Sequence, residues 1–182
     1  YTQAPPGGWA WTPLPGGVPD ADDTPGALIA LHQLSENPAS EIDRAMLGIR
    51  WLLGLQNRDG GMPTFCRGWG HLPFDRSSAD ITAHTIRAWH LWKPYVTPPL
   101  QHSIQVATRR ALDYLKRMQK EDGSWDPLWF GNQHLEGENN PLYGTAKVVE
   151  GWLCLASEPA EEPGLSHAIH WLIDQQSDNG GW

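Results

Sequence analysis

Three carboxylates stand close together in the segment Asp20-Ala21-Asp22-Asp23-Thr24. Crowded carboxylates repel one another, so we expect at least one of their pKa values to be raised. A carboxyl group that stays protonated at neutral pH is an acid held ready to transfer a proton. Alternatively, the acids complement the dipole of a helix that begins here, with Asp22 or Asp23 as its cap, or bind Mg²⁺ for a diphosphate. No second acidic cluster or basic patch supports the magnesium site.

A second pair of residues with acid–base chemistry is Asp80 and His84, which are four residues apart and so share one face of a predicted helix. A His that one carboxylate keeps cationic could hydrogen-bond a second carboxyl group and decide which oxygen holds the proton. Taken alone, the pair is more simply explained as an acid in the first helical turn and a core His.

The chain shows no pattern of metal ligands. His167 and His170 lie three residues apart, but no Cys or acidic residue joins them at the spacing that a metal needs. The two cysteines, Cys66 and Cys154, stand in unrelated contexts, which argues against zinc and against a disulfide framework. We therefore expect neither a metal nor another cofactor.

Aromatic residues crowd the segments around these acids, in a sequence with eleven Trp. They are Trp9, Trp11, Phe65, Trp69, Trp129 and Tyr143. The faces of such rings stabilise a nearby cation by about 0.5–2 kcal/mol each. For most of the Trp residues, however, packing in the core is the simpler explanation.

An internal repeat determines how these residues are positioned. Three stretches, residues 51–62, 114–125 and 171–182, each have an aromatic residue, a Gln five residues later and a Gly-small-bulky trio at the end. Each stretch is typical of the last turns of a helix followed by a glycine turn. The Gln can bond the loose backbone groups at the helix end, so we interpret it as structural.

Hydrophobic periodicity predicts six helices, and no two-residue alternation predicts a strand. The helices cover residues 24–34, 40–56, 78–92, 100–119, 142–156 and 165–176, with Ser40 and Ser77 or Ser78 as N-caps. Paired in order they form three αα-hairpins, and each glycine turn follows the second helix of a pair. We therefore expect an all-α fold, about half of an α/α toroid, in a single fragment of residues 1–182. Residues 1–23 form its acid-bearing loop and residues 24–182 its hairpins.

The overall composition excludes several classes of protein. The net charge of −8 without a basic stripe argues against nucleic acid as a partner. The sequence contains no run of about 18 apolar residues, the length needed to cross a bilayer. Its two unpaired cysteines are typical of a protein in the reducing cytoplasm. Both ends look excised, so the remainder of the same chain is expected to cover the apolar flank of the half-ring.

These landmarks, in this order and over nearly the whole chain, resemble the triterpene cyclase family. The repeats look like the QW motifs of that family. Residues 20–24 resemble the D-x-D-D-T acid motif of squalene–hopene cyclases. Residues 78–84 resemble the segment that bears the His partner of the acid.

The resemblance implies a role for each acid–base residue. Asp22 would protonate a terminal alkene, with Asp20 and Asp23 as flanking carboxylates. His84, oriented by Asp80, would be the hydrogen-bonding partner of the acid. No cofactor is implied.

The resemblance also implies that aromatic rings stabilise the cation. Residues 7–11 resemble the Gly-Gly-aromatic-Ala-aromatic loop of the family, which makes Trp11 such a ring. Phe65 and Trp129 fall near two others, and Tyr143 near the network that reprotonates the acid. The chain departs from the family at Met62, which replaces a Trp, in residues 63–69 and in a longer segment before Tyr143.

Taken together, the resemblance implies class II cyclisation, started by protonation, of a squalene-like polyprene. It further implies that the full-length enzyme is a homodimer peripheral to the membrane. Because half a ring leaves apolar surface uncovered, we expect the fragment alone to be inactive. Two alternatives remain. A toroid-like scaffold or binding protein would keep the repeats without the chemistry. A protein prenyltransferase β-subunit would need a zinc site of Asp, Cys and His and basic residues for a diphosphate, and the sequence shows neither.

Overall fold

The computed structural model describes residues 5–65 and 75–182. Within these residues the chain forms α1 (Asp23–Leu34), α2 (Ile42–Leu55), α3 (Ala79–Trp92), α4 (Pro98–Met118), α5 (Pro141–Leu153) and α6 (Pro163–Asp174). The strands of the described part are β1 (Met62–Pro63) and β2 (Ser77–Ser78), which pair antiparallel. The all-α prediction is confirmed, and each helix lies within a few residues of its predicted range.

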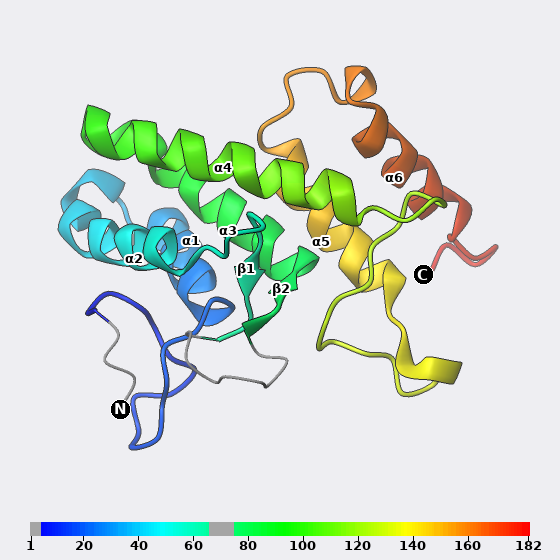
Figure 1. Cartoon of the computed structure of the whole chain (residues 1–182), viewed down its shortest axis with the longest axis horizontal. Coiled ribbons are helices and arrows are strands. Elements are labelled where there is room, and N and C mark those ends of the chain that lie inside the picture. Colours follow the sequence, from blue (N-terminus) through cyan, green and yellow to red (C-terminus); the bar gives the residue numbers. More distant parts are fainter. Residues whose placement is uncertain (1–4, 66–74) are drawn as a thin grey trace.

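The helices form two layers (Figure 1). In one layer α3 lies between α1 and α5 and packs against both, and in the other α2 contacts α4. The pairs α1–α2, α3–α4 and α5–α6 are hairpins that follow one another across the molecule. Alternate helices therefore occupy alternate layers, as in part of an α/α toroid.

The core follows from this layering. α3 is buried on most sides and contributes Ile86, Trp89 and Trp92, none of which is exposed. One apolar cluster joins α3 to α1 and α2, and a second joins it to α5 and α6. The indole of Trp92 donates a hydrogen bond of 2.8 Å to the carbonyl of Leu28, which fixes α1 against α3.

The repeats join one hairpin to the next. The amide of Gln56 donates to the carbonyl of Gly60 in its own turn (2.8 Å) and to that of Ala107 in α4 (2.9 Å). The amide of Gln119 does the same with Gly123 (2.9 Å) and with Gly164 in α6 (2.8 Å). The structural interpretation of these Gln residues therefore holds, and each one bonds the second helix of the following hairpin.

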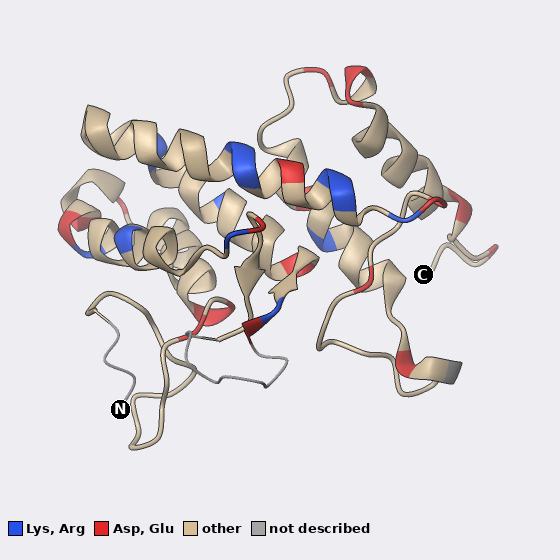
Figure 2. Cartoon of the chain, in the orientation of Figure 1, with Lys and Arg blue, Asp and Glu red and all other residues tan. Residues whose placement is uncertain are grey.

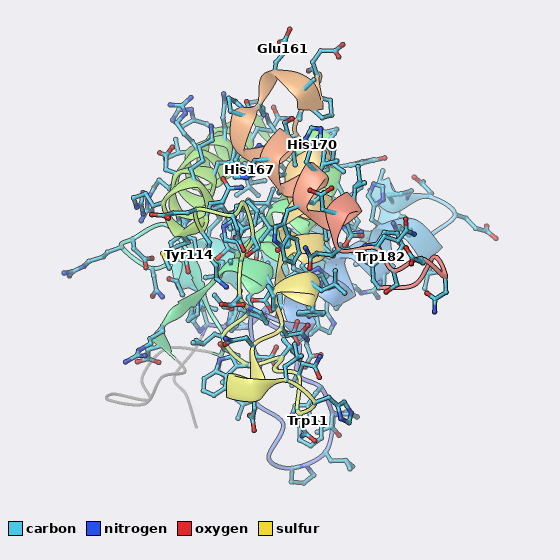
Figure 3. All side chains as sticks on the ribbon, turned by 90° about the vertical axis from the view of Figure 1, so that its right-hand side faces the viewer. Trp11, Tyr114, Glu161, His167, His170 and Trp182 are labelled. Atoms are coloured by element: carbon cyan, nitrogen blue, oxygen red, sulfur yellow. The ribbon has the colours of Figure 1, made fainter. Side chains whose placement is uncertain are left out.

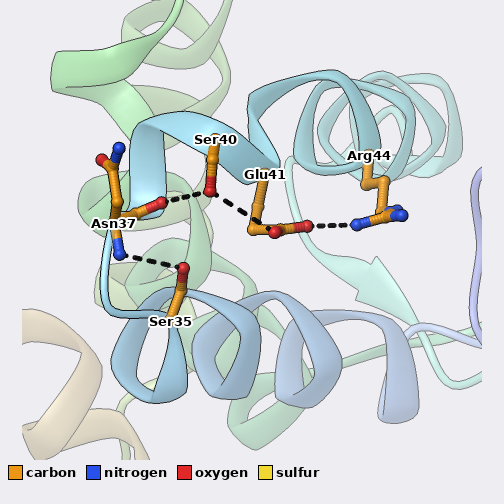
Figure 4. A network of polar contacts seen from close by, with 5 residues as sticks. All are labelled: Ser35, Asn37, Ser40, Glu41 and Arg44. Carbon is orange, nitrogen blue, oxygen red and sulfur yellow. Dashed lines mark hydrogen bonds and ion pairs between the residues drawn. The ribbon is translucent and has the colours of Figure 1, made fainter.

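The start of α2 differs from the prediction, because Ser40 is not its cap. A 3₁₀ helix, η1 (Pro38–Glu41), precedes α2, and the side chain of Asn37 caps it by accepting from the N–H of Ala39. The hydroxyl of Ser40 donates to the carbonyl of Asn37 at 2.7 Å (Figure 4). Glu41 then pairs with Arg44, so this corner is held by local polar contacts.

Charged residues of both signs are interspersed over the helices (Figure 2). Within the described residues, no helix is both long and apolar enough to cross a membrane.

Candidate active site

Asp20 anchors the acidic segment at the start of α1. It is 3% exposed, and its Oδ1 accepts from the backbone N–H of Asp22 (2.9 Å) and of Asp23 (2.6 Å). Its backbone forms a bridge with Phe65. Asp20 therefore satisfies the open N–H groups of the helix. The capping that the sequence suggested for Asp22 or Asp23 is wrong for Asp22, which stands at the N-cap position without a side-chain capping bond.

The carboxyl groups of Asp20, Asp22 and Asp80 hold their protons more tightly than an ordinary Asp side chain does. Burial raises the pKa of Asp20 to about 7, although the two backbone N–H bonds act in the other direction. Burial also raises the pKa of Asp22, helped by the charges of Asp23 and Asp80, and burial raises that of Asp80. Removal from water, more than mutual repulsion, is thus what shifts these acids.

Asp80 and His84 lie on α3 where it faces α1 and α5. Asp80 is 2% exposed and one of its oxygens accepts from the hydroxyl of Ser78, which therefore does not cap the helix. Its other oxygen and Nδ1 of His84 are buried without a hydrogen-bond partner among the described residues. A Cβ placed on Gly26 of α1 would lie 3.5 Å from Nε2 of His84, so the imidazole faces α1.

The expectation of a cationic His84 is wrong for this structure. Burial, with the positive charges of Lys147 and Arg87, lowers the pKa of His84 to about 4. The imidazole is therefore neutral at pH 7. The sequence suggested a cation because Asp80 stands four residues away, but burial and the charges of Lys147 and Arg87 determine the pKa of His84.

Asp22 and His84 line one pocket of about 460 Å³. Asp23, Trp9 and Trp11 line it too, together with small residues of α1. The structure thus brings the acid segment and the His of α3 to the same side of the fold. No direct hydrogen bond between Asp22 and His84 is present in the described part of the chain.

The N-terminal loop carries the aromatic wall of this pocket. The N–H of Trp9 donates to Oγ1 of Thr24 at 2.9 Å, which ties the loop to the first turn of α1. Trp11 is 74% exposed and projects from the loop at one end of the molecule (Figure 3). It edges the pocket without being enclosed.

The other predicted aromatic residues lie around the acid segment. Phe65 pairs with Asp20 through the backbone, and the indole of Trp129 donates to the hydroxyl of Thr64. Tyr143, in the first turn of α5, packs its ring 5.2 Å from that of Phe130. Burial and the charges of Asp80 and Asp22 raise the pKa of Tyr143 to about 12. The last shift shows that α5 shares the electrostatic environment of the acids.

Lys147 is a residue that the sequence reasoning missed. Its charge acts on Asp22, Asp80 and His84, and its Nζ lies 5.9 Å from the ring centre of Tyr143. The available signal was its spacing, since Lys147 stands one helical turn after Tyr143 and so on the same face of α5.

Within the described residues, no three His, Cys, Asp or Glu side chains are arranged to hold a metal ion. Cys66 and Trp69 lie outside those residues. Cys154 is half-buried, and burial raises the pKa of its thiol to about 11. His170 contacts the carbonyl of Ser166 within its own helix. It lies on α6 with His167, far from Trp11 in the view of Figure 3.

Comparison with known proteins agrees with the fold. Residues 1–182 match the family model described as the squalene–hopene cyclase C-terminal domain. The chain is 29% identical to enfumafungin synthase of Hormonema carpetanum, over 97% of this chain and 14% of that protein. It is 31% identical to the probable squalene–hopene cyclase of Sinorhizobium fredii, over 97% of this chain and 27% of that protein.

A solved structure with the same fold is that of the type II terpene cyclase MstE from Scytonema, in complex with geranylgeranyl dihydroxybenzoate. The match has a TM-score of 0.64 at 20% sequence identity and covers 98% of this chain and 46% of that one. The chain therefore spans less than half the length of each of these proteins.

Proposed function

Because this chain belongs to the family of squalene–hopene cyclase C-terminal domains, we propose that it carries the proton donor of a class II terpene cyclase. The substrate is a squalene-like polyprene, which the full-length enzyme cyclises through carbocations. One observation carries the proposal. Asp22, a half-buried acid without a capping bond, lines with His84 a pocket that the rings of Trp9 and Trp11 also line.

The first step is transfer of the proton of Asp22 to the CH carbon of the terminal alkene. The cation then lies on the neighbouring carbon, which bears two methyl groups, and the next alkene attacks it to close a ring. Loss of a proton from the last cation, or capture of water, ends the reaction. Asp22 is left as a carboxylate and must recover a proton before the next turnover. These steps balance with the substrate, the acid and water alone.

The environment of Asp22 suits this step. Burial and the charges of Asp23 and Asp80 raise the pKa of Asp22, which favours the protonated acid that the first step needs. Asp20 holds the backbone around it through two N–H bonds. We assign to Asp20 and Asp23 the role of flanking carboxylates. We assign to His84 the role of the residue beside the acid, with Asp80 next to it on α3.

Aromatic side chains supply the second requirement, stabilisation of the cation. Trp11 lines the pocket, and Phe65 and Trp129 stand beside the acid segment. Tyr143 approaches from α5. Each ring face offers about 0.5–2 kcal/mol to a nearby cation, and more where water is excluded.

The class of substrate determines where in the cell the full-length enzyme must work. A polyprene dissolves in the bilayer, so we propose that the full-length enzyme works at the cytoplasmic surface of a membrane, as a homodimer.

Incubation of the full-length protein with squalene and with a shorter polyprene, followed by mass spectrometry, tests the proposal. Wild-type protein should form cyclic products, and Asp22→Asn should form none, because the amide is nearly isosteric but is not an acid. Asp43→Asn is the matched control, since Asp43 is an exposed acid in the first turn of α2. Recovery of only linear substrate from wild-type protein would favour the scaffold alternative.

A further inference from the structure

Lys147 lies on the side of α5 that packs against α3. Gly151, one turn further along α5, approaches so closely that a Cβ there would lie 2.5 Å from the carbonyl oxygen of Ala83. Lys147 therefore lies on the same face of α5 as Gly151, the face that contacts α3 in the region of Asp80 and His84. Its Nζ lies over the ring of Tyr143, 5.9 Å from the centre.

The two basic side chains that act on His84 differ in their partners. Arg87 forms an ion pair of 2.8 Å with Glu150 of α5, and the carboxylate of Glu150 balances the charge of Arg87. Lys147 forms no direct ion pair with a carboxylate of the described residues. Among the described residues, Lys147 is therefore a half-buried base without an ion pair, and its charge acts on Asp22 and Asp80.

Several ionisable groups surround Asp22. Asp20 and Asp23 belong to its own segment, Asp80 and His84 come from α3, and Tyr143 and Lys147 from α5. His84 is neutral and Tyr143 keeps its proton at pH 7. Within this group, Lys147 alone brings a positive charge.

We propose that Lys147 is a positioning residue for proton transfer, whose ammonium stabilises the carboxylate that Asp22 becomes when it gives up its proton. The inference rests on the proposed function and replaces the cationic His84 that the sequence suggested. The physical reason is that a nearby positive charge lowers the energy of the conjugate base and so strengthens the acid. Lys147 accordingly lowers the pKa of both Asp22 and Asp80.

The pH dependence of turnover gives the first test, in full-length protein with squalene. Activity needs protonated Asp22 and is lost as pH rises through its pKa. Lys147→Met should raise that pKa, so the alkaline limb should move to higher pH by about one unit. The plateau rate at low pH should fall by about 3–10-fold, because the acid is weaker.

Two further variants separate this role from a structural one. Lys147→Arg keeps the charge and should restore the wild-type limb. Lys116→Met is the control, since Nζ of Lys116 lies 5.3 Å from the ring centre of Trp152 and 3.3 Å from Glu162, and its charge is not among those that act on Asp22 or Asp80. It should leave the limb unchanged. A lower rate in Lys147→Met with an unmoved limb, or failure of Lys147→Arg to restore it, would overturn the inference.

A titration without substrate distinguishes this inference from the proposed function. The infrared band of protonated carboxyl groups is followed against pH, and the part due to Asp22 is obtained by subtracting Asp22→Asn. Its midpoint should lie higher in Lys147→Met than in wild type, even if no substrate turns over. Equal midpoints would overturn the role of Lys147, whereas a shifted midpoint without any cyclic product would leave Lys147 in place and reject the proposed cyclase.

Discussion

The acidic residues of this site are distinguished by their hydrogen-bond partners rather than by their positions in the sequence. Asp20 accepts two backbone N–H groups, and Asp80 accepts from Ser78. Asp22 makes no capping bond and lines the pocket. Neighbouring carboxyl groups can therefore serve different roles, one holding the backbone and one offering a proton.

At the residue scale, Asp20→Asn should stabilise the protein at pH 8 but not at pH 4. In the folded state Asp20 keeps its proton up to about pH 7, whereas the ordinary pKa of 3.8 applies when the chain unfolds. The favourable contribution is thus present below about pH 4 and is lost as pH rises to 7. Asn can accept the same N–H groups without carrying a buried charge.

The expected gain in free energy of unfolding at pH 8 is about 1–3 kcal/mol, measured by thermal or urea unfolding of the full-length protein. Asp43→Asn, at an exposed position, should change it little. Equal effects of Asp20→Asn at both pH values would contradict the raised pKa of Asp20.

The sequence predicted a raised pKa among the acids of residues 20–24 but not the neutral state of His84. The spacing of Asp80 and His84 and the crowding in residues 20–24 marked candidate residues, and of these Asp22, Asp23 and His84 line the pocket. The neutral state of His84 depends on how α1 and α5 cover it, which no local pattern contains. Lys147 was missed for the same reason, since a Lys on a helix is most simply a solvated residue.

At the element scale, the repeats act as joints between hairpins. The turn-closing residues Met62 and Trp125 donate their N–H groups to hydroxyls of Thr82 and Thr145 in the first helix of the next hairpin. The Gln of each of these repeats bonds the second helix of that hairpin. A single repeat thus holds both helices of its neighbour, which is why the spacing in the sequence is so regular.

Gly60→Ala should be strongly destabilising. Gly60 has φ of +96°, and a Cβ there would lie 2.2 Å from the carbonyl oxygen of Arg110 in α4. Both the backbone conformation and the close approach oppose a side chain. We expect a loss of about 2–4 kcal/mol in the free energy of unfolding.

Gly54→Ala is the matched control in the same hairpin. Gly54 lies inside α2, and a Cβ there would have nothing within 4 Å, so Ala should stabilise the helix by up to about 1 kcal/mol. Thermal unfolding of both variants measures the contrast. A tolerated Gly60→Ala would show that the turn does not dock on α4 as the structure has it.

The elements were predicted well because the repeat and the helical period reinforce each other. The exceptions are local. The 3₁₀ helix at Pro38–Glu41 replaced the predicted cap at Ser40, since Asn37 and Pro38 begin a turn of their own. The short pairing of Met62 and Pro63 with β2 has too few residues to produce a two-residue alternation.

At the scale of the whole molecule, the hairpins follow one another across two layers and leave apolar side chains uncovered. Exposed examples are Leu34 (84%), Trp11 (74%), Trp182 (62%) and Ile173 (59%). Trp182 stands beyond the end of α6, at the opposite end of the chain from Trp11 (Figure 3).

The 182-residue chain on its own should therefore self-associate and lack cyclase activity. Large exposed apolar surfaces seek partners, and half a ring leaves the reacting cation open to water. Sedimentation velocity over a range of concentrations measures the association. A monodisperse monomer that converts squalene unaided would show that the half-ring interpretation is wrong.

Reaction of the full-length protein with squalene in deuterated water shows whether Asp22 starts cyclisation by giving a proton to an alkene. The carboxyl of Asp22 exchanges with solvent, so its proton becomes a deuteron. If Asp22 is the donor, the cyclic product carries one non-exchangeable deuterium, on the ring carbon next to the one that bears two methyl groups, and Asp22→Asn forms no product. A cyclic product without deuterium there, or normal turnover by Asp22→Asn, would contradict this role of Asp22.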